Sequence, residues 1–266
     1  MLYTMYIGLA YFIGSVIWCS IIWCFQLYPK ENLLSWWHLF SVLRGFVWTS
    51  GIACFNLAID KIGLSKFNQW KNLQGPIGSI LMLTLLNDVV GAKIIFLILG
   101  IVTMLISAVL FTIKTVEDRK TTMAGVLCAV FSAFCFGFTA FIQRLLVGQG
   151  LIFSQMLYHS AFIVISAAII YLLQTRRPQE LFRVSPKTWL PVSAGAMFLI
   201  ATILSGLAYT MIPGSVSFSL VQLNAVWTIL TGIFIFREIS FQKHWLRITA
   251  GFVFAFGAIV LLLFAL

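Results

Sequence analysis

The stretch Asn68-Gln69-Trp70-Lys71-Asn72-Leu73-Gln74 runs directly into Gly75-Pro76 and then into the apolar residues 77–86. Five of its seven side chains are strongly polar, although the residues that follow are hydrophobic enough to enter a membrane. Hydrocarbon penalises polar side chains, and a charge at mid-bilayer costs on the order of 3 kcal/mol even on lenient insertion scales. We therefore expect this polar run to face a water-filled cavity or a protein neighbour, and we interpret it as one wall of a solute-binding site.

The composition of the whole chain is that of a membrane protein. Of the 266 residues, 61% are hydrophobic and only 9% are charged, whereas soluble domains carry about 25% charged residues. The net charge of +10 does not indicate nucleic-acid binding, because the basic residues lie in loops between apolar segments. The five cysteines fall inside apolar spans, so no disulfide, metal or cofactor is predicted. The sequence holds no nucleophile–base pair or phosphate-binding loop, so an enzyme is not predicted either.

Nine apolar segments are long enough to cross a bilayer. Each has about 20 residues or more, which spans a hydrocarbon core of about 30 Å at a helical rise of 1.5 Å per residue. Short polar loops separate the segments. The predicted fold is an all-α, polytopic membrane helix bundle with nine transmembrane helices in one integral membrane domain, at residues 3–27, 37–59, 67–87, 92–113, 122–146, 152–174, 188–211, 215–236 and 244–266.

Lys and Arg lie mainly in the loops on one side of these spans. Twelve fall on that side and four, including Arg44, fall on the other. The positive-inside rule places the richer side in the cytoplasm. The chain is then expected in the cell (plasma) membrane, with its N-terminus in the cytoplasm and its C-terminus outside.

A weak internal repeat relates the two halves of the chain. Residues 39–88 align with 189–238 without a gap after a shift of 150 positions, and an odd number of spans between the copies makes them enter from opposite faces. Transporters use such inverted-topology repeats to build a site near the membrane midplane. We expect repeat halves at 1–115, with four spans, and 116–266, with five, so a further helix before Met1 would complete the first half. The polar positions that coincide are Asn72 with Gln222 and Gln74 with Asn224.

This repeat predicts where a solute binds. Amide side chains from the two copies would meet near the midplane, and an amide offers both donors and an acceptor to hydroxyl-rich, uncharged solutes. Pro76 cannot donate to the carbonyl of Asn72, so a helix kink is expected there. The predicted substrate-binding residues are Asn68, Gln69, Lys71, Asn72, Gln74, Gln222, Asn224 and Trp227.

Each of these residues has a structural alternative. The polar run could supply hydrogen bonds between helices without touching a ligand, and Lys71 could extend toward the cytoplasm. Trp227 suits helix packing as well as stacking on a sugar face. His159, in the sixth span, fits a hydrogen-bonded packing residue better than a proton carrier. It is nevertheless the candidate carrier of a coupling proton, because all seven acidic residues fall in loops or at span ends.

Two stretches carry a family resemblance: Ile62-Gly63-Leu64-Ser65 followed by 68–78, and Ser217-Phe218-Ser219-Leu220-Val221-Gln222 leading to 231–234 and Arg237-Glu238. With them the chain resembles the glucose/ribose porters, a sugar transporter family of the drug/metabolite transporter superfamily. The resemblance extends over essentially the whole chain. It implies ten helices in two inverted five-helix repeats, and sugar uptake that is often proton-coupled. The chain departs from this pattern in lacking the first family helix.

From these features we expect a secondary membrane transporter that moves a small polar solute, above all a sugar such as glucose or ribose, by alternating access. Its expected partners are the solute, bilayer lipid and a coupling proton, while its oligomeric state is left open. Two alternatives remain. A drug or metabolite exporter of the same superfamily is favoured by the 15% aromatic content, and a non-transporting membrane subunit or sensor is suggested by the missing helix.

Overall fold

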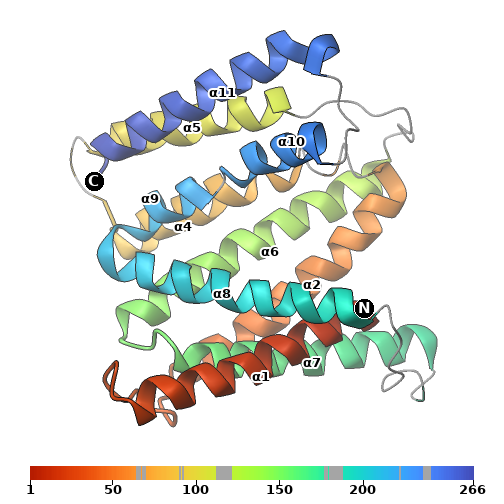
Figure 1. Ribbon diagram of the computed structural model, residues 1–266, viewed down its shortest axis with the longest axis vertical. Coiled ribbons are helices and arrows are strands. Elements are labelled where there is room, and N and C mark those ends of the chain that lie inside the picture. Colours follow the sequence, from red (N-terminus) through yellow and green to blue (C-terminus); the bar gives the residue numbers. More distant parts are fainter. Residues whose placement is uncertain are drawn as a thin grey trace. The chain divides into compact units, whose positions relative to one another are not determined.

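The computed structural model describes residues 1–63, 67, 70–89, 91, 93–111, 122–176, 179, 188–221, 223–235 and 241–266. Every regular element among these residues is helical (Figure 1). The α-helices are α1 (Leu2–Cys24), α2 (His38–Ile62), α4 (Gln74–Leu86), α5 (Lys93–Phe111), α6 (Met123–Gly148), α7 (Ser154–Thr175), α8 (Trp189–Met211), α9 (Gly214–Val221), α10 (Asn224–Phe234) and α11 (Phe241–Phe264).

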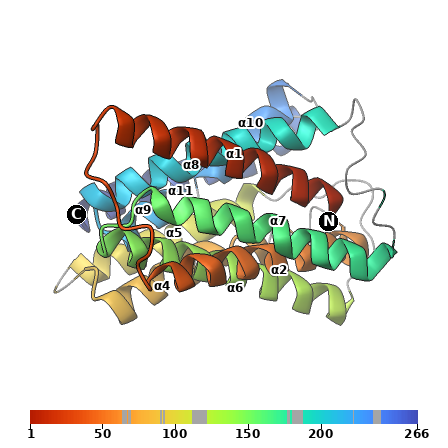
Figure 2. The ribbon, with the colours of Figure 1, turned by 90° about the horizontal axis from the view of Figure 1, so that it is seen from below.

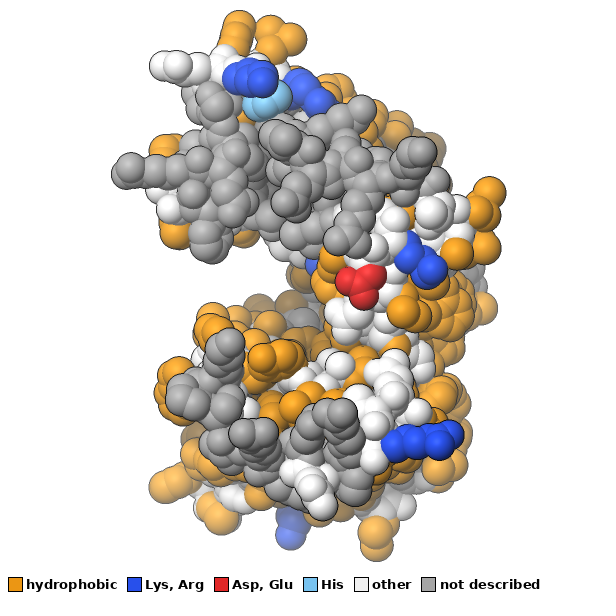
Figure 3. Space-filling view, turned by 90° about the vertical axis from the view of Figure 1, so that its right-hand side faces the viewer, with side chains coloured by type: hydrophobic (Ala, Val, Ile, Leu, Met, Phe, Trp, Pro, Cys, Tyr) orange, Lys and Arg blue, Asp and Glu red, His pale blue; other side chains and the backbone are white. Residues whose placement is uncertain are grey.

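Seven helices in the described part of the chain are long and apolar enough to cross a membrane: α1, α2, α5, α6, α7, α8 and α11. They correspond to seven of the nine predicted spans, and each end agrees with its prediction to within three residues. Large hydrophobic side chains such as Leu173 and Trp189 are exposed on these helices, and hydrophobic side chains are abundant on the visible surface (Figure 3). An apolar exterior of this kind suits contact with lipid, so the prediction of a polytopic helical membrane protein is confirmed.

The other two predicted spans are interrupted. In the span predicted at 67–87, α4 begins only at Gln74. The span predicted at 215–236 is divided into α9 and α10, and α10 begins at Asn224. These are the two spans that carry the predicted binding residues, so the polar segments coincide with the breaks in the helical pattern.

Both interruptions have the same backbone geometry. The N–H groups of Leu73 and Leu223 each donate to the carbonyl oxygen three residues earlier, at 3.1 and 3.0 Å. Their backbone angles are φ −64°, ψ −18° for Leu73 and φ −60°, ψ −8° for Leu223. A 3₁₀-type turn within a helical region often marks a hinge or a sequence under strain. The two turns are 150 residues apart, which equals the shift of the predicted repeat.

The chain forms two compact units, each with segments from both halves of the sequence. Unit 1 consists of Met1–Ala53 and Ile142–Met211, and unit 2 of Cys54–Phe141 and Ile212–Leu266. In unit 1, α1 packs against both α7 and α8. Its contact with α7 contains the buried side chains Met5, Tyr6, Ala167 and Tyr171.

Helices of unit 1 approach one another closely at two glycines. A Cβ atom on Gly45 of α2 would lie 2.6 Å from the carbonyl oxygen of His159 on α7. A Cβ atom on Gly195 of α8 would collide with the carbonyl oxygen of Ile7 on α1. Small residues allow membrane helices to pack with their backbones in contact, so these glycines set how near the helix pairs lie.

We expect Gly45→Ala to destabilise the protein by about 1–3 kcal/mol, because the added methyl group must push α2 away from α7. Gly206→Ala is the matched control: a Cβ atom there would lie 3.5 Å from its nearest neighbour, an ordinary contact. That variant should unfold at or above the wild-type temperature, since alanine favours helix over glycine. Thermal unfolding of the detergent-purified proteins compares the two, and equal midpoints would contradict the close approach at Gly45.

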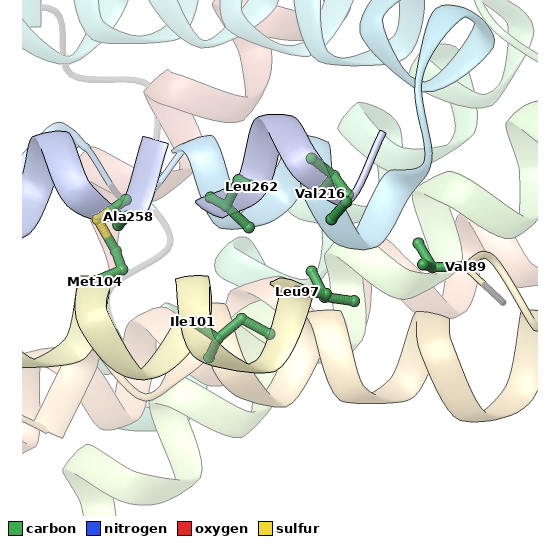
Figure 4. Close-up of a cluster of buried hydrophobic side chains, with 8 residues drawn as sticks. Val89, Leu97, Ile101, Met104, Val216, Ala258 and Leu262 are labelled. Carbon is green, nitrogen blue, oxygen red and sulfur yellow. The ribbon is translucent and has the colours of Figure 1, made fainter. Parts of the chain in front are cut away.

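In unit 2, α5 lies alongside α11, and α4 lies beside α9 (Figures 1 and 2). Apolar side chains fill the space between α5 and α11. Figure 4 shows Leu97 and Met104 of α5 close to Ala258 and Leu262 of α11, and Val216 of α9 belongs to the same cluster. This core therefore holds α9, the first part of the interrupted span at 215–236, against α5 and α11.

Candidate functional site

The first interruption opens onto a cleft in unit 2. The cleft has about 280 Å³ of empty space, which includes space open to solvent. Its polar side chains are those of Asn72 and Ser219. A few polar groups in an otherwise apolar wall are typical of sites that orient a small ligand. The other lining residues are Gly75, Pro76, Ile101, Met104, Leu105 and Ala108.

Pro76 fits the backbone conformation at the N-terminus of α4. Because α4 begins at Gln74, Pro76 lies in its first turn, where a backbone N–H would have no partner within the helix. The carbonyl of Asn72 can accept no bond from position 76, since proline has no N–H. Backbone that departs from helix is tolerated at membrane depth where it lines a cavity or is buried in protein, and Asn72 and Pro76 both line the cleft.

Three buried serines join α4 to α9 beside the cleft. The hydroxyl of Ser79 donates to the carbonyl of Ser215 at 3.0 Å, and the hydroxyl of Ser219 donates to the same carbonyl at 2.8 Å. The hydroxyl oxygens of Ser79 and Ser219 are 2.9 Å apart. The backbone N–H of Ser215 in turn donates to Asp88 at 2.8 Å, and a carboxylate at a helix N-terminus is stabilised by the helix dipole. These bonds hold Ser219 in the cleft wall.

Only part of the predicted polar run lines the cleft. Asn72 and Pro76 line it, whereas Gln74 is buried and is not a lining residue. Lys71 is half-buried and also does not line the cleft. Asn68 and Gln69 lie outside the described residues.

The second copy of the run contributes less to this cleft. Asn224 is exposed at the start of α10, and Trp227 on the same helix is 69% exposed. Neither lines the cleft, and Gln222 lies outside the described residues. The residue of this span that does line the cleft is Ser219, which was not among the predicted binding residues. The sequence indicated Ser219 only weakly as a binding residue, because a serine in an apolar helix is more often a packing residue.

His159 lies in a different place, in unit 1. Its side chain is fully buried on α7, with Nδ1 3.4 Å from the hydroxyl oxygen of Tyr11. Its ring packs edge to face on Phe198, with centroids 6.2 Å apart. Among the described residues its Nε2 has no hydrogen-bond partner.

Near His159 is a buried cation that the sequence analysis assigned to the non-cytoplasmic loops. Arg44 is only 4% exposed and lies on α2 six residues after its start, about 9 Å along the helix. Its two terminal nitrogens donate to Gln155 at 3.2 Å and to Gln143 at 2.7 Å. The sequence contained one indication of this role, since Arg44 lies well inside the apolar span predicted at 37–59. Charged residues inside membrane spans are generally functional.

Comparison with known proteins gives one family match and a shared fold. The family model Sugar_transport, described as "Sugar transport protein", matches residues 6–265. No curated protein matches the chain. Among solved structures, one named only "Crystal structure of protein" aligns with a TM-score of 0.58 at 13% identity, over 97% of this chain and 95% of that chain. At this identity the likeness concerns the fold alone.

Proposed function

This chain belongs to the sugar transport protein family, and from that premise we propose that it is a secondary transporter of a monosaccharide such as glucose or ribose. Family membership points to a transporter, not an enzyme, and the seven long apolar helices of the described residues support a multi-pass membrane protein. The finer proposal depends on one observation, the cleft beside the interruption at Leu73.

The cleft suits a neutral, hydroxyl-rich solute. The amide of Asn72 offers donors and an acceptor, and the hydroxyl oxygen of Ser219, whose proton is donated to the carbonyl of Ser215, offers an acceptor. The remaining wall is apolar, which suits the C–H faces of a sugar ring. Asn72 and Ser219 belong to the two interrupted spans. A change of backbone conformation at the Leu73 or Leu223 turn would therefore alter the shape of the cleft.

An inverted repeat is part of the proposal, and the helix boundaries support it. The shift of 150 residues relates α1 to α7, α2 to α8, α4 to α10 and α5 to α11. Within unit 1 the related helices α1 and α7 pack together, and within unit 2 the related helices α5 and α11 do so. The tightly packed Gly45 and Gly195 are related by the same shift.

We further propose that the two 3₁₀ turns are hinges for alternating access, since related breaks in membrane helices are typical of transporter binding sites. Gln74 and Asn224 begin the helices that follow these turns. Asn68, Gln69, Lys71 and Gln222 stay candidate substrate-binding residues in this proposal. For proton-coupled uptake, His159 is the proposed carrier.

The test is uptake of labelled glucose and ribose into proteoliposomes that contain the purified protein. We expect saturable uptake above that of protein-free liposomes, and counterflow exchange when the same unlabelled sugar is inside. An imposed pH gradient tests coupling. Neither uptake nor counterflow of any monosaccharide, from protein that unfolds cooperatively in a thermal scan, would contradict the proposed function.

A further inference from the structure

We infer that unit 1 contains an additional ligand site, in which the guanidinium of Arg44 binds an oxyanion, the carboxylate or phosphate group of a small organic solute. The inference does not require that the cleft of unit 2 binds sugar. It starts from a buried positive charge for which the described residues supply no negative partner.

The positive charge of Arg44 lies where its desolvation is energetically unfavourable. Arg44 is 4% exposed and lies inside α2, one of the helices apolar enough to cross the membrane. Charged side chains within membrane helices are rare, and those that are found mark ligand or ion pathways. A buried charge is normally paired with an opposite charge, because desolvation otherwise makes it strongly unfavourable.

The partners of Arg44 in the described part of the chain are all uncharged. Its hydrogen-bond partners are the amide oxygens of Gln143 and Gln155. The oxygens that interact with it electrostatically are the phenols of Tyr11 and Tyr209, which are neutral at pH 7. The positive charge is therefore solvated by dipoles and is not neutralised.

Glu31, the buried carboxylate among the described residues of unit 1, is engaged elsewhere. Both oxygens of Glu31 accept hydrogen bonds from the start of α7, namely from the backbone N–H groups of Phe153 and Ser154, and one also accepts from Ile152. These bonds make Glu31 a helix cap, not a counter-ion for Arg44.

Arg44 also has N–H donors that make no hydrogen bond among the described residues. A guanidinium carries five N–H donors in a planar fork that matches a carboxylate or phosphate. The structure gives it two hydrogen bonds, and its buried Nε has no partner among the described residues. The Nε2 of His159, whose ring interacts electrostatically with Arg44, is also buried without a partner. The unmatched N–H donors of the guanidinium call for an acceptor that carries negative charge.

The fork is held in place from both sides. Gln143 donates from its amide nitrogen to the hydroxyl of Ser205 at 2.9 Å and to the carbonyl of Thr202 at 3.3 Å, which turns its oxygen toward Arg44. The amide nitrogen of Gln155 likewise donates to the carbonyl of Ile152 at 3.3 Å. A guanidinium fixed in this way is preorganised for a ligand, in contrast to one that extends freely to the membrane surface.

Aromatic rings in contact with one another, from Trp48 through Phe198 to Tyr11, fit the organic part of the ligand. Trp48 lies one helical turn after Arg44 on α2 and stacks on Phe198 of α8, with ring centroids 5.2 Å apart. Phe198 also contacts Tyr11 edge to face at 5.0 Å. Rings of this kind pack against apolar faces of small molecules, and Trp48 provides a fluorescent reporter.

The experiment measures binding to the purified full chain by tryptophan fluorescence, with thermal stabilisation as a second readout. The probes are glucuronate, glucose 6-phosphate, their neutral parent glucose, and inorganic phosphate. We expect at least one of the two acidic sugars to bind about tenfold or more tightly than glucose. Whichever of them binds identifies the source of the oxyanion. Equal affinity of glucose and both acidic sugars in the wild-type protein would overturn the inference without any variant.

Variants then assign the effect to one side chain. Arg44→Gln should remove the preference for the acidic sugar, and Arg44→Lys, which keeps the charge but lacks the fork, should weaken it severalfold. Arg144→Gln, on α6 next to Gln143 in sequence, is the matched control and should keep the preference. A preference that survives in correctly folded Arg44→Gln overturns the inference, as does inorganic phosphate binding as tightly as glucose 6-phosphate. Sugar uptake through Asn72 is measured separately, so failure here and failure of the proposed transport are distinguishable.

Discussion

Replacing Glu31 with alanine is expected to lower the free energy of unfolding by about 3–5 kcal/mol. The buried carboxylate accepts hydrogen bonds from the backbone N–H groups of Ile152, Phe153 and Ser154, at 3.1, 2.9 and 2.8 Å, and from the hydroxyl of Ser154. The N–H groups at the start of a helix have no partner within the helix. Hydrogen bonds to a charged group contribute about 1.5–3 kcal/mol each, although not additively, and the helix dipole adds to them.

A graded series of variants makes this prediction specific. Glu31→Gln keeps one acceptor oxygen and should lose less stability than Glu31→Ala. Lys30→Ala changes the exposed neighbouring side chain and should unfold within about 0.5 kcal/mol of the wild type. Thermal or denaturant unfolding in detergent gives the order. If Glu31→Ala unfolded at the same midpoint as Lys30→Ala, the carboxylate would not be the cap that joins the segment before α2 to α7.

The second large effect is expected on transport. Asn72→Leu should reduce sugar uptake at low substrate concentration by about tenfold or more. The leucine removes the one amide that lines the cleft among the described residues and occupies part of its roughly 280 Å³. Each lost hydrogen bond to a ligand is worth about 1 kcal/mol, and 1.4 kcal/mol corresponds to a factor of ten in binding. The loss should fall on apparent affinity, because in the proposed site the amide of Asn72 contacts the solute.

Gln149→Leu is the control for Asn72→Leu, since it also replaces an amide side chain with leucine, but at an exposed position beyond the end of α6. It should transport like the wild type. Ser219→Ala removes the other polar side chain that lines the cleft and should show a smaller loss of affinity than Asn72→Leu. Unchanged apparent affinity in Asn72→Leu, in protein that reconstitutes normally, would exclude the cleft as the sugar site.

Several features were predictable because they depend on local composition. A bilayer demands helices of about 20 apolar residues, so α1, α5, α7 and α8 could be located from hydrophobic length alone. The polar run before Pro76 marked the segment whose Asn72 lines the cleft. A kink at Pro76 was predicted from the proline itself. The 3₁₀ turn at Leu73 was not, because it depends on how the segment packs against neighbouring helices.

The buried cluster in unit 1 was beyond the reach of sequence reasoning. The residues that bind Arg44 are 99 and 111 positions away in the chain, and the N–H groups that bind Glu31 are 121 to 123 positions away. Counting charges by loop placed Arg44 with residues at the membrane surface. Nothing in a single sequence states that Gln143 and Gln155 come to lie beside α2.

The sequence by itself determined that this chain enters a membrane as a bundle of helices, because lipid accepts only long apolar segments whose backbone groups are paired within each helix. It also determined which segment supplies an amide to the cleft. Only the tertiary structure decided where the helices break, which serine lines the cleft together with Asn72, and that Arg44 is buried among neutral partners. The physical reason is that these properties depend on which distant side chains become neighbours in a low-dielectric interior, where hydrogen bonding and charge pairing are settled by packing.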